Sequence, residues 1–252
     1  MGATALFVTL DHHPEISDRI SLITALAPIS YTSHIIGMLQ LVTPFLNSLP
    51  LGLIKSEFLP NSEILHNVTD KYCQEGTPTQ VSCYALLFSI TGRSKINFLS
   101  FFTEYVIDFD HQNSIGFDIE QQIKGNLVRQ LHHFPSGTSN KCIVHYAQMI
   151  QSGRFCAFDY GEDGNLEHYQ QTEPPAVNLT NVTPPIALYL AKNNDYLVQP
   201  GDYQILVNEL PNIVYKHMVD YEKWNHMDSL VAKDAHTLVY PYIFEQMEQY
   251  KF

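Results

Sequence analysis

Basic residues are scarce in this chain. Of its 252 residues, 14 are Lys or Arg and 26 are Asp or Glu, which gives a formal net charge of −12 at pH 7. A surface that binds nucleic acid needs basic side chains to neutralise phosphates, so we expect no nucleic-acid partner. Long apolar runs are also missing. No stretch reaches the roughly 18 residues that span a bilayer, so we expect no transmembrane segment.

Two further patterns are missing from the sequence. The first twenty residues contain Asp11 and Glu15 and do not begin with a basic segment, so they do not form a signal peptide. Structural zinc sites use spaced Cys and His ligands, whereas the histidines here include the adjacent pairs His12-His13 and His132-His133, whose side chains diverge. We therefore expect no metal and no other cofactor.

What is present indicates a globular protein. Hydrophobic residues make up 45% of the chain and charged residues 16%, a balance that excludes a disordered chain. Three Asn-x-Ser/Thr sequons, at Asn67, Asn178 and Asn181, favour a secreted or lumenal protein that carries glycans. That location conflicts with the missing signal peptide. The conflict disappears if the chain is an N-terminally truncated fragment.

The hydrophobic pattern predicts an α/β architecture. Strands buried on both faces read as near-continuous apolar runs, and helices read as longer amphipathic segments. We expect such strands at 20–27 and 185–191, a further strand at 213–219, and helices at 3–12, 202–210 and 229–249. Strands that alternate with helices form a parallel sheet, here of about three strands.

The middle of the chain has a different pattern. Helical spacing recurs over 34–57, 121–131 and 140–152, and Ser139 is placed to cap the last of these helices. We therefore predict a partial α/β core formed by residues 1–29 and 176–252. A mostly helical cap, residues 30–175, is inserted into it.

Two residues near the C-terminus carry the candidate chemistry. Asp195 follows one expected strand, and His226 lies in the loop after the next. An acid and then a histidine at these positions are two members of the triad of an α/β-hydrolase. The alternatives are that Asp195 only caps a helix or forms a turn, and that Asp228 is the acid instead.

Ordered motifs extend the resemblance along the chain. They are Leu26-Ala-Pro28, Phe134-Pro-Ser-Gly-Thr-Ser139, Ser152-Gly-Arg-Phe155, Phe158-Asp-Tyr-Gly161, Asn178-Leu-Thr-Asn-Val-Thr-Pro-Pro185, Asn194-Asp-Tyr-Leu197, Leu210-Pro-Asn212 and Asn225-His-Met-Asp228. In this order they resemble the acid lipases, the gastric and lysosomal group of α/β-hydrolases. The fold class implied is the C-terminal part of an α/β-hydrolase with an inserted cap.

The resemblance assigns roles to residues. His226 is the general base and acid, and Asp195 orients and stabilises it. Asp228 resembles the acid that the family has two places after the histidine, and we interpret it as structural. Met1-Gly2 resembles the residues that follow the nucleophilic serine, so the serine is expected just before Met1, and the Met1 backbone N–H is expected in the oxyanion hole. Cys73 and Cys83, ten residues apart, resemble the cap disulfide of the family.

One segment departs from the family. Residues 93–116 have no counterpart there and are rich in Phe, Ile, Tyr, Asn and Lys. These residue types are common in translated AT-rich DNA, so our hypothesis is a retained intron or a gene-model error. A true insertion in the cap is the alternative.

The implied function is hydrolysis of lipid esters, triacylglycerol or sterol ester, at a lipid–water interface. Without its serine the chain itself should be inactive. A cap of this kind needs an apolar inner face, for which the candidates are Leu39, Leu41, Phe45 and Leu46. Two alternatives stay open: a non-catalytic lipid-binding or regulatory remnant, and a different capped hydrolase such as an epoxide hydrolase, which uses an aspartate nucleophile.

Overall fold

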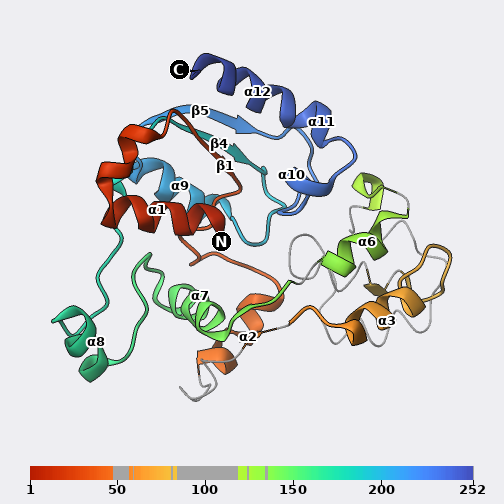
Figure 1. Ribbon diagram of the computed structural model, residues 1–252, viewed down its shortest axis with the longest axis horizontal. Coiled ribbons are helices and arrows are strands. Elements are labelled where there is room, and N and C mark those ends of the chain that lie inside the picture. Colours follow the sequence, from red (N-terminus) through yellow and green to blue (C-terminus); the bar gives the residue numbers. More distant parts are fainter. Residues whose placement is uncertain are drawn as a thin grey trace.

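The computed structural model describes residues 1–47, 57–58, 60–80, 82–83, 119–123, 125–133 and 136–251. The two ends of the chain together form an α/β unit, and the middle of the chain forms a helical unit beside it (Figure 1). The unusual segment 93–116 lies outside the described residues, so the hypothesis about its origin stays a prediction.

A parallel sheet lies at the centre of the α/β unit. Its strands are β1 (Ile23–Leu26), β4 (Ile186–Leu190) and β5 (Ile213–Met218), in the order β1-β4-β5. Ile23 pairs with Ile186 and Leu188 with Lys216, and both pairings are parallel. The three strands expected from the sequence are therefore confirmed, as is their parallel direction.

Strand β4 is buried along its whole length because both faces of the sheet are covered. On one face, Ile186, Leu188 and Leu190 pack in a cluster with residues of α1 (Gly2–His12) and α9 (Pro200–Glu209), among them Phe7, Leu10 and Leu206. On the other face, Ala187 and Tyr189 pack with Trp224 and Val239. Alternate side chains of one strand thus contribute to two separate clusters.

The C-terminal helix predicted over 229–249 is wrong in detail. The structure has three helices there: α10 (Asp228–Val231), α11 (Ala235–Leu238) and α12 (Tyr240–Gln249). Ala232 is extended and ends α10. Pro241 lies in the first turn of α12, where its missing N–H costs no helical hydrogen bond, so a new helix starts there.

Helix ends elsewhere follow local signals. Ser139 caps α7 (Asn140–Ser152) as predicted, because its Oγ accepts a hydrogen bond from Lys141 N at 3.1 Å. The helix expected at 121–131 is replaced by a 3₁₀ turn, η3 (Ile119–Gln121), and by α6 (Asn126–His133). Gly125 separates the two with φ 72°, a conformation that glycine adopts without strain.

The helical unit contains further short elements. Besides α6 and α7 they are α2 (Met38–Asn47), α3 (Glu63–Tyr72) and α8 (Glu162–Tyr169), and a small antiparallel pair of strands, β2 (Glu57–Phe58) with β3 (Thr138–Ser139). The α/β unit also has two 3₁₀ turns, η1 (Pro14–Arg19) and η4 (Leu179–Asn181). Cys73 and Cys83 form a disulfide, as expected. None of the helices that the structure describes is long and apolar enough to cross a membrane.

Candidate active site

Asp195 lies in the turn between β4 and α9. Its side chain is 1% exposed, and its Oδ1 accepts hydrogen bonds from Leu197 N at 2.9 Å and Val198 N at 3.0 Å. The turn then enters α9 through Pro200, a residue suited to a first helical turn. One carboxylate oxygen is thereby held by the backbone, and the other is left for a side chain.

His226 lies in the loop that follows β5 and meets that second oxygen. Its Nδ1 is 2.9 Å from Asp195 Oδ2, although the two residues are 31 apart in the sequence. Parallel neighbouring strands end at the same edge of a sheet, which brings the two loops together. The His226 side chain is 20% exposed, so its ring reaches the surface while its partner is buried.

Asn194 joins the same two loops next to this pair. It is buried, and its Nδ2 donates to the carbonyl of Lys223, three residues before His226. The relative position of Asp195 and His226 therefore depends on more than their own contact.

Asp228 has a different environment from Asp195. It is fully buried, and its Oδ2 accepts a hydrogen bond from Asn225 N at 2.8 Å. The Asn225 side chain in turn accepts from Met227 N at 2.9 Å. These bonds hold the turn that carries His226, which fits the structural interpretation of Asp228.

Trp224 anchors the base of this loop. Its ring is buried in the core, and its indole Nε1 donates to Ser229 Oγ at 3.1 Å. A buried indole N–H needs an acceptor, and Ser229 supplies it from within the core.

The start of α1 lies at the same edge of the sheet. Thr4 Oγ1 donates to the carbonyl of Ile29, which closely follows the end of β1. The Met1 carbonyl accepts from Ala5 N at 2.9 Å, the first bond of the helix. Backbone N–H groups at the start of a helix and its dipole favour negative charge at such a position.

Chemically, a carboxylate that binds Nδ1 fixes the imidazole ring and leaves Nε2 as the nitrogen that can accept a proton. Within the described ranges no side chain is hydrogen-bonded to Nε2 of His226. The same ranges contain no group of three His, Cys, Asp or Glu side chains that could hold a metal ion.

A pocket of about 260 Å³ lies beside the His226 loop. Met227 and Val231 line it from the core, and Leu131 and His133 of α6 line it from the helical unit. Its exposed lining atoms are mostly carbon, which suits an alkyl chain, and Asn126, Arg129 and Gln130 also border it. Among the cap residues expected to face an acyl chain, Leu39 packs on the core cluster, whereas Leu41 and Phe45 are 70% and 69% exposed.

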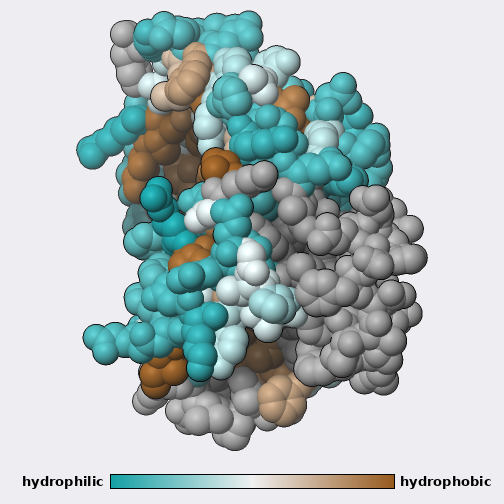
Figure 2. Space-filling view, turned by 90° about the vertical axis from the view of Figure 1, so that its right-hand side faces the viewer, coloured by the Kyte–Doolittle hydropathy of each residue, from teal (hydrophilic) through white to brown (hydrophobic). Residues whose placement is uncertain are grey.

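Apolar surface on the side of the molecule that carries α6 and α10 forms patches between hydrophilic regions (Figure 2). The exposed large apolar side chains of the described residues include Leu41, Phe45, Ile64, Leu230 and Phe244. They are scattered over several helices, so exposure alone does not define a binding face.

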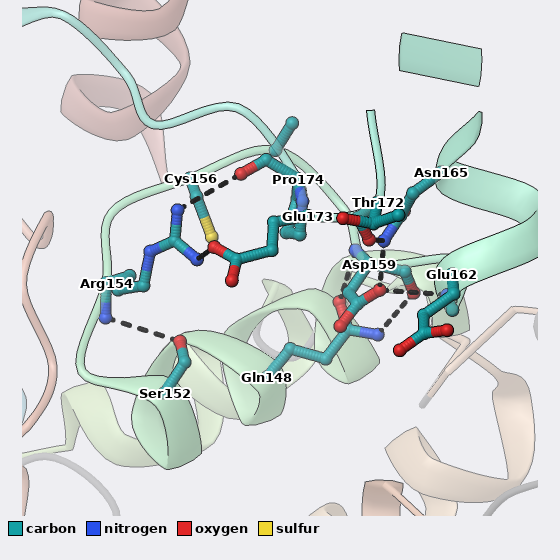
Figure 3. Close-up of a pocket in the computed structure, with 12 residues that line it drawn as sticks. Gln148, Ser152, Arg154, Cys156, Asp159, Glu162, Asn165, Thr172, Glu173 and Pro174 are labelled. Carbon is teal, nitrogen blue, oxygen red and sulfur yellow. Dashed lines mark hydrogen bonds and ion pairs between the residues drawn. The ribbon is translucent and has the colours of Figure 1, made fainter. Parts of the chain in front are cut away.

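A larger pocket, of about 440 Å³, lies between α7 and α8 and includes neither the Asp195 loop nor the His226 loop. Figure 3 shows Arg154 beside Glu173 at one end and Asp159 with Asn165 at the other. Arg154 Nη1 is 2.8 Å from Glu173 Oε2, and Asn165 Nδ2 donates to Asp159 Oδ1 at 2.7 Å. These polar groups bind one another, so they do not point to a ligand in this pocket.

The three sequons differ in their surroundings. Asn67 and Asn178 are exposed. Asn181 is partly buried, and its Nδ2 donates to Asp11 Oδ1 at 2.9 Å. A glycan on Asn181 would have to replace that hydrogen bond.

Cys142 and Cys156 are free thiols, and burial raises the pKa of Cys156.

Sequence reasoning missed several residues around the site. Asn194 and Asn225 stabilise the two loops, and the spacing of Asn225 and Asp228 is the only local signal that could have suggested their turn. A second pair, His34 with Asp202, is made by residues 168 apart in the sequence, at 2.8 Å. No pattern in the sequence predicts that contact.

Comparison with known proteins gives consistent matches. The chain is 31% identical to gastric triacylglycerol lipase of Bos taurus over 254 residues, which is 99% of the chain and 56% of the relative. It is 30% identical to the Homo sapiens protein of the same name, with the same coverage, and 28% identical to lipase member J of Homo sapiens over 97% of the chain and 60% of that protein. No protein-family model matches the chain.

The chain thus spans little more than half the length of the curated relatives that it matches. The matches cover both ends of the α/β unit and the helical unit between them.

Proposed function

We propose that Asp195 and His226 are two members of a Ser-His-Asp triad that hydrolyses lipid esters, as in the acid lipases to which this chain is related. The single observation that carries the proposal is the 2.9 Å contact between His226 Nδ1 and buried Asp195 Oδ2. It supports these roles because a base for ester hydrolysis needs a fixed ring and a stabilised imidazolium.

In the proposed reaction, the serine Oγ attacks the ester carbonyl and His226 Nε2 takes its proton. Asp195 stabilises the imidazolium that forms. The C–O bond to the alcohol then breaks as His226 returns the proton to the leaving oxygen. Water, deprotonated by the same nitrogen, attacks the acyl-enzyme, so that the fatty acid leaves and the serine regains its proton.

The nucleophile in this proposal is a serine immediately before Met1, outside the 252 residues. The Met1 N–H then donates to the oxyanion, helped by the start of α1. The contact between Thr4 and Ile29 supports this arrangement, since it joins the first turn of α1 to the segment that follows β1. It follows that the chain by itself should not hydrolyse esters.

The proposed substrates are triacylglycerols or sterol esters presented at a lipid–water interface. The apolar pocket beside Met227 supports an acyl or alkyl chain next to the reacting carbonyl. The disulfide Cys73–Cys83 and the exposed sequons at Asn67 and Asn178 support a secreted or lysosomal location. We propose Asn181 as the third, less accessible glycan site.

The decisive experiment compares the chain with a version extended upstream by the genomic codons. With a p-nitrophenyl ester, the chain alone should show no turnover. The extended protein should be active if it reads Gly-x-Ser in frame. In the active form, Asp195→Asn should lower kcat by about 10⁴-fold, because the wrong histidine tautomer is then favoured.

If the 252-residue chain hydrolyses the ester and His226→Ala abolishes that activity, the placement of the serine is contradicted. An extended protein that retains its activity in both the His226→Ala and the Asp195→Asn variants would contradict the triad itself.

A second candidate is a non-catalytic lipid-binding or regulatory protein. The apolar pocket favours it, because that pocket is formed entirely by residues of this chain. This candidate predicts that the chain binds a fluorescent fatty acid and that Val231→Asp weakens the binding. An extended protein without esterase activity would favour this candidate over the lipase.

A further inference from the structure

A short segment of the helical unit contacts the His226 loop from both sides. The segment is Glu120-Gln121, at the end of η3. Gln121 is 2% exposed, and it contacts Lys233 and Asp234, which lie at the turn between α10 and α11. Glu120 contacts residues that precede His226.

Gln121 uses three polar groups in this contact. Its carbonyl accepts from Lys233 N at 2.8 Å. Its side-chain Nε2 donates to Asp234 Oδ2 at 3.0 Å, and its Oε1 accepts from Asp234 N at 3.3 Å. A buried amide that binds both a carboxylate and a backbone N–H of one residue defines a single docked position.

Glu120 extends the contact to the other side of the loop. Its Oε2 accepts from Tyr221 Oη at 3.0 Å and lies 3.7 Å from Lys223 Nζ. The carbonyl of Lys223 is also the acceptor for Asn194, which precedes Asp195. The docked segment, the loop of the base and the loop of the acid are therefore joined through Lys223, by an ion pair from Glu120 to its side chain and by a hydrogen bond from Asn194 to its carbonyl.

The loop between these two anchors has little regular structure of its own. From Tyr221 to Asp234 it contains one short helix, α10, and its remaining residues are in turns or extended backbone. Segments of this kind open locally at a lower free energy than sheets or long helices. An anchor on each side of His226 limits such opening.

We propose that Gln121 is a positioning residue: it docks the helical unit on the α10–α11 turn and so keeps His226 against Asp195. The inference rests on the proposed function for its catalytic meaning. A displacement of about 1 Å in a reacting group can cost about 100-fold in rate. Loss of the Gln121 contact should therefore lower kcat and leave KM nearly unchanged.

The first test uses Gln121→Leu, with Gln122→Leu as the matched control. Both residues are buried, but Gln122 Oε1 has no hydrogen-bond partner among the described residues. Gln121→Leu leaves the polar groups of Asp234 without their amide partner, whereas Gln122→Leu removes an unpaired oxygen. The measurement is amide hydrogen exchange at Trp224, Leu230 and Val231, together with the imidazole NMR signals of His226.

Gln121→Leu should raise exchange at these three amides by about tenfold and shift the His226 signals, while Gln122→Leu leaves both at the wild-type values. Unchanged exchange and unchanged His226 signals in Gln121→Leu would overturn the proposal. So would equal changes in the two variants.

A second variant covers a failure of Gln121→Leu to fold. Gln121→Glu has nearly the same shape, but its carboxylate faces that of Asp234, with Lys233 and Glu120 as the neighbouring charges. The quantity compared is the exchange rate of the variant divided by that of wild type at the same pH. This ratio should be well above 1 at neutral pH. It should return towards 1 at acid pH, where the new carboxyl group is protonated and can donate. A ratio that does not change with pH would contradict the assignment.

Both exchange experiments are independent of ester hydrolysis. If the extended protein is inactive but Gln121→Leu still releases the His226 loop, the proposed function fails and the docking role stands. If the enzyme is active and the kcat of Gln121→Leu equals that of wild type, the docking role fails alone.

Discussion

At the scale of single residues, buried carboxylates of one chemical type have distinct tasks in this protein. Asp195 divides its two oxygens between backbone N–H groups and His226. Asp228 accepts from the backbone of Asn225 and supports the turn that carries His226. Asp202 binds both the backbone and the ring of His34. Local partners, and not residue type, therefore separate a catalytic candidate from structural ones.

Ser229→Ala tests the anchor of the His226 loop. The substitution removes the acceptor of the Trp224 indole N–H inside the core, and an unpaired buried donor costs about 1–3 kcal/mol. We expect the free energy of unfolding, measured by urea titration, to fall by that amount. Ser229→Thr, which keeps a hydroxyl, is the control, and equal losses in both variants would argue against the hydrogen bond as the cause.

His145 should make stability depend on pH. Burial lowers the pKa of His145 from its ordinary value of 6.5, against an opposing hydrogen bond to the Cys156 carbonyl. The unfolded chain then binds more protons than the folded one below about pH 6.5, so stability is present at neutral pH and falls as the pH drops through that value.

The measurement is the unfolding free energy at about pH 7 and about pH 5, for wild type and for His145→Gln, which can still donate to the Cys156 carbonyl. The variant should lose less stability on acidification than wild type. A loss that is equal or larger in the variant would show that His145 is not the group responsible.

At the scale of elements, the chain between β1 and α2 is fastened along α9. Tyr31 donates to Glu209 at the end of that helix, His34 binds Asp202 in its first turn, and Ile36 N donates to the carbonyl of Tyr196. Tyr196 directly follows Asp195. The helical unit is thus attached to the loop of Asp195 at its beginning and to the loop of His226 through Gln121.

Asp202→Ala tests the first of these attachments. Asp202 is buried and accepts from His34 N at 3.0 Å and from the His34 ring at 2.8 Å. The His34 side chain is 57% exposed and its ring can bind water instead, so the backbone N–H of His34 is the donor that loses its acceptor. We expect a loss of about 1–3 kcal/mol in unfolding free energy and faster hydrogen exchange at Ile36 N.

The matched control is Glu209→Ala at the other end of α9. Its bond to Tyr31 is at an exposed site and should contribute at most about 1 kcal/mol. A larger effect of Glu209→Ala than of Asp202→Ala would contradict the role of buried Asp202.

At the scale of the whole molecule, charge governs contact with surfaces. The chain carries a net charge of −12 at pH 7, and its 12 histidines can offset that charge as they protonate, consistent with a pI of about 5.3. A strongly negative protein is repelled by an anionic lipid surface, and one near zero charge is not.

We therefore expect electrophoretic mobility to change sign near pH 5.3. Vesicles with anionic headgroups should bind the protein at about pH 4.5 but not at about pH 7.5, and added salt should weaken the binding at acid pH. Equal binding at both pH values would indicate that apolar contacts, and not charge, dominate adsorption.

The sequence by itself determined the parts of this protein that depend on local pattern. A continuous apolar run predicted β4, because a strand covered on both faces has no exposed position for a polar side chain. Strand β5 was predictable from its β-branched and aromatic residues, although alternate positions along it are exposed. The Ser139 cap was also predictable from the sequence, because a capping serine binds a backbone N–H only two or three residues further along the chain. The order of Asp195 and His226 after successive strands indicated that they would meet, since parallel strands end at one edge.

Only the tertiary structure decided which residues hold that site in place. The contacts of Gln121 with Asp234 and of His34 with Asp202 join residues 113 and 168 apart, and the break of the C-terminal helix into three depends on how it packs over the sheet. Hydrogen bonds between distant segments follow from the path of the whole chain, and no local periodicity encodes that path.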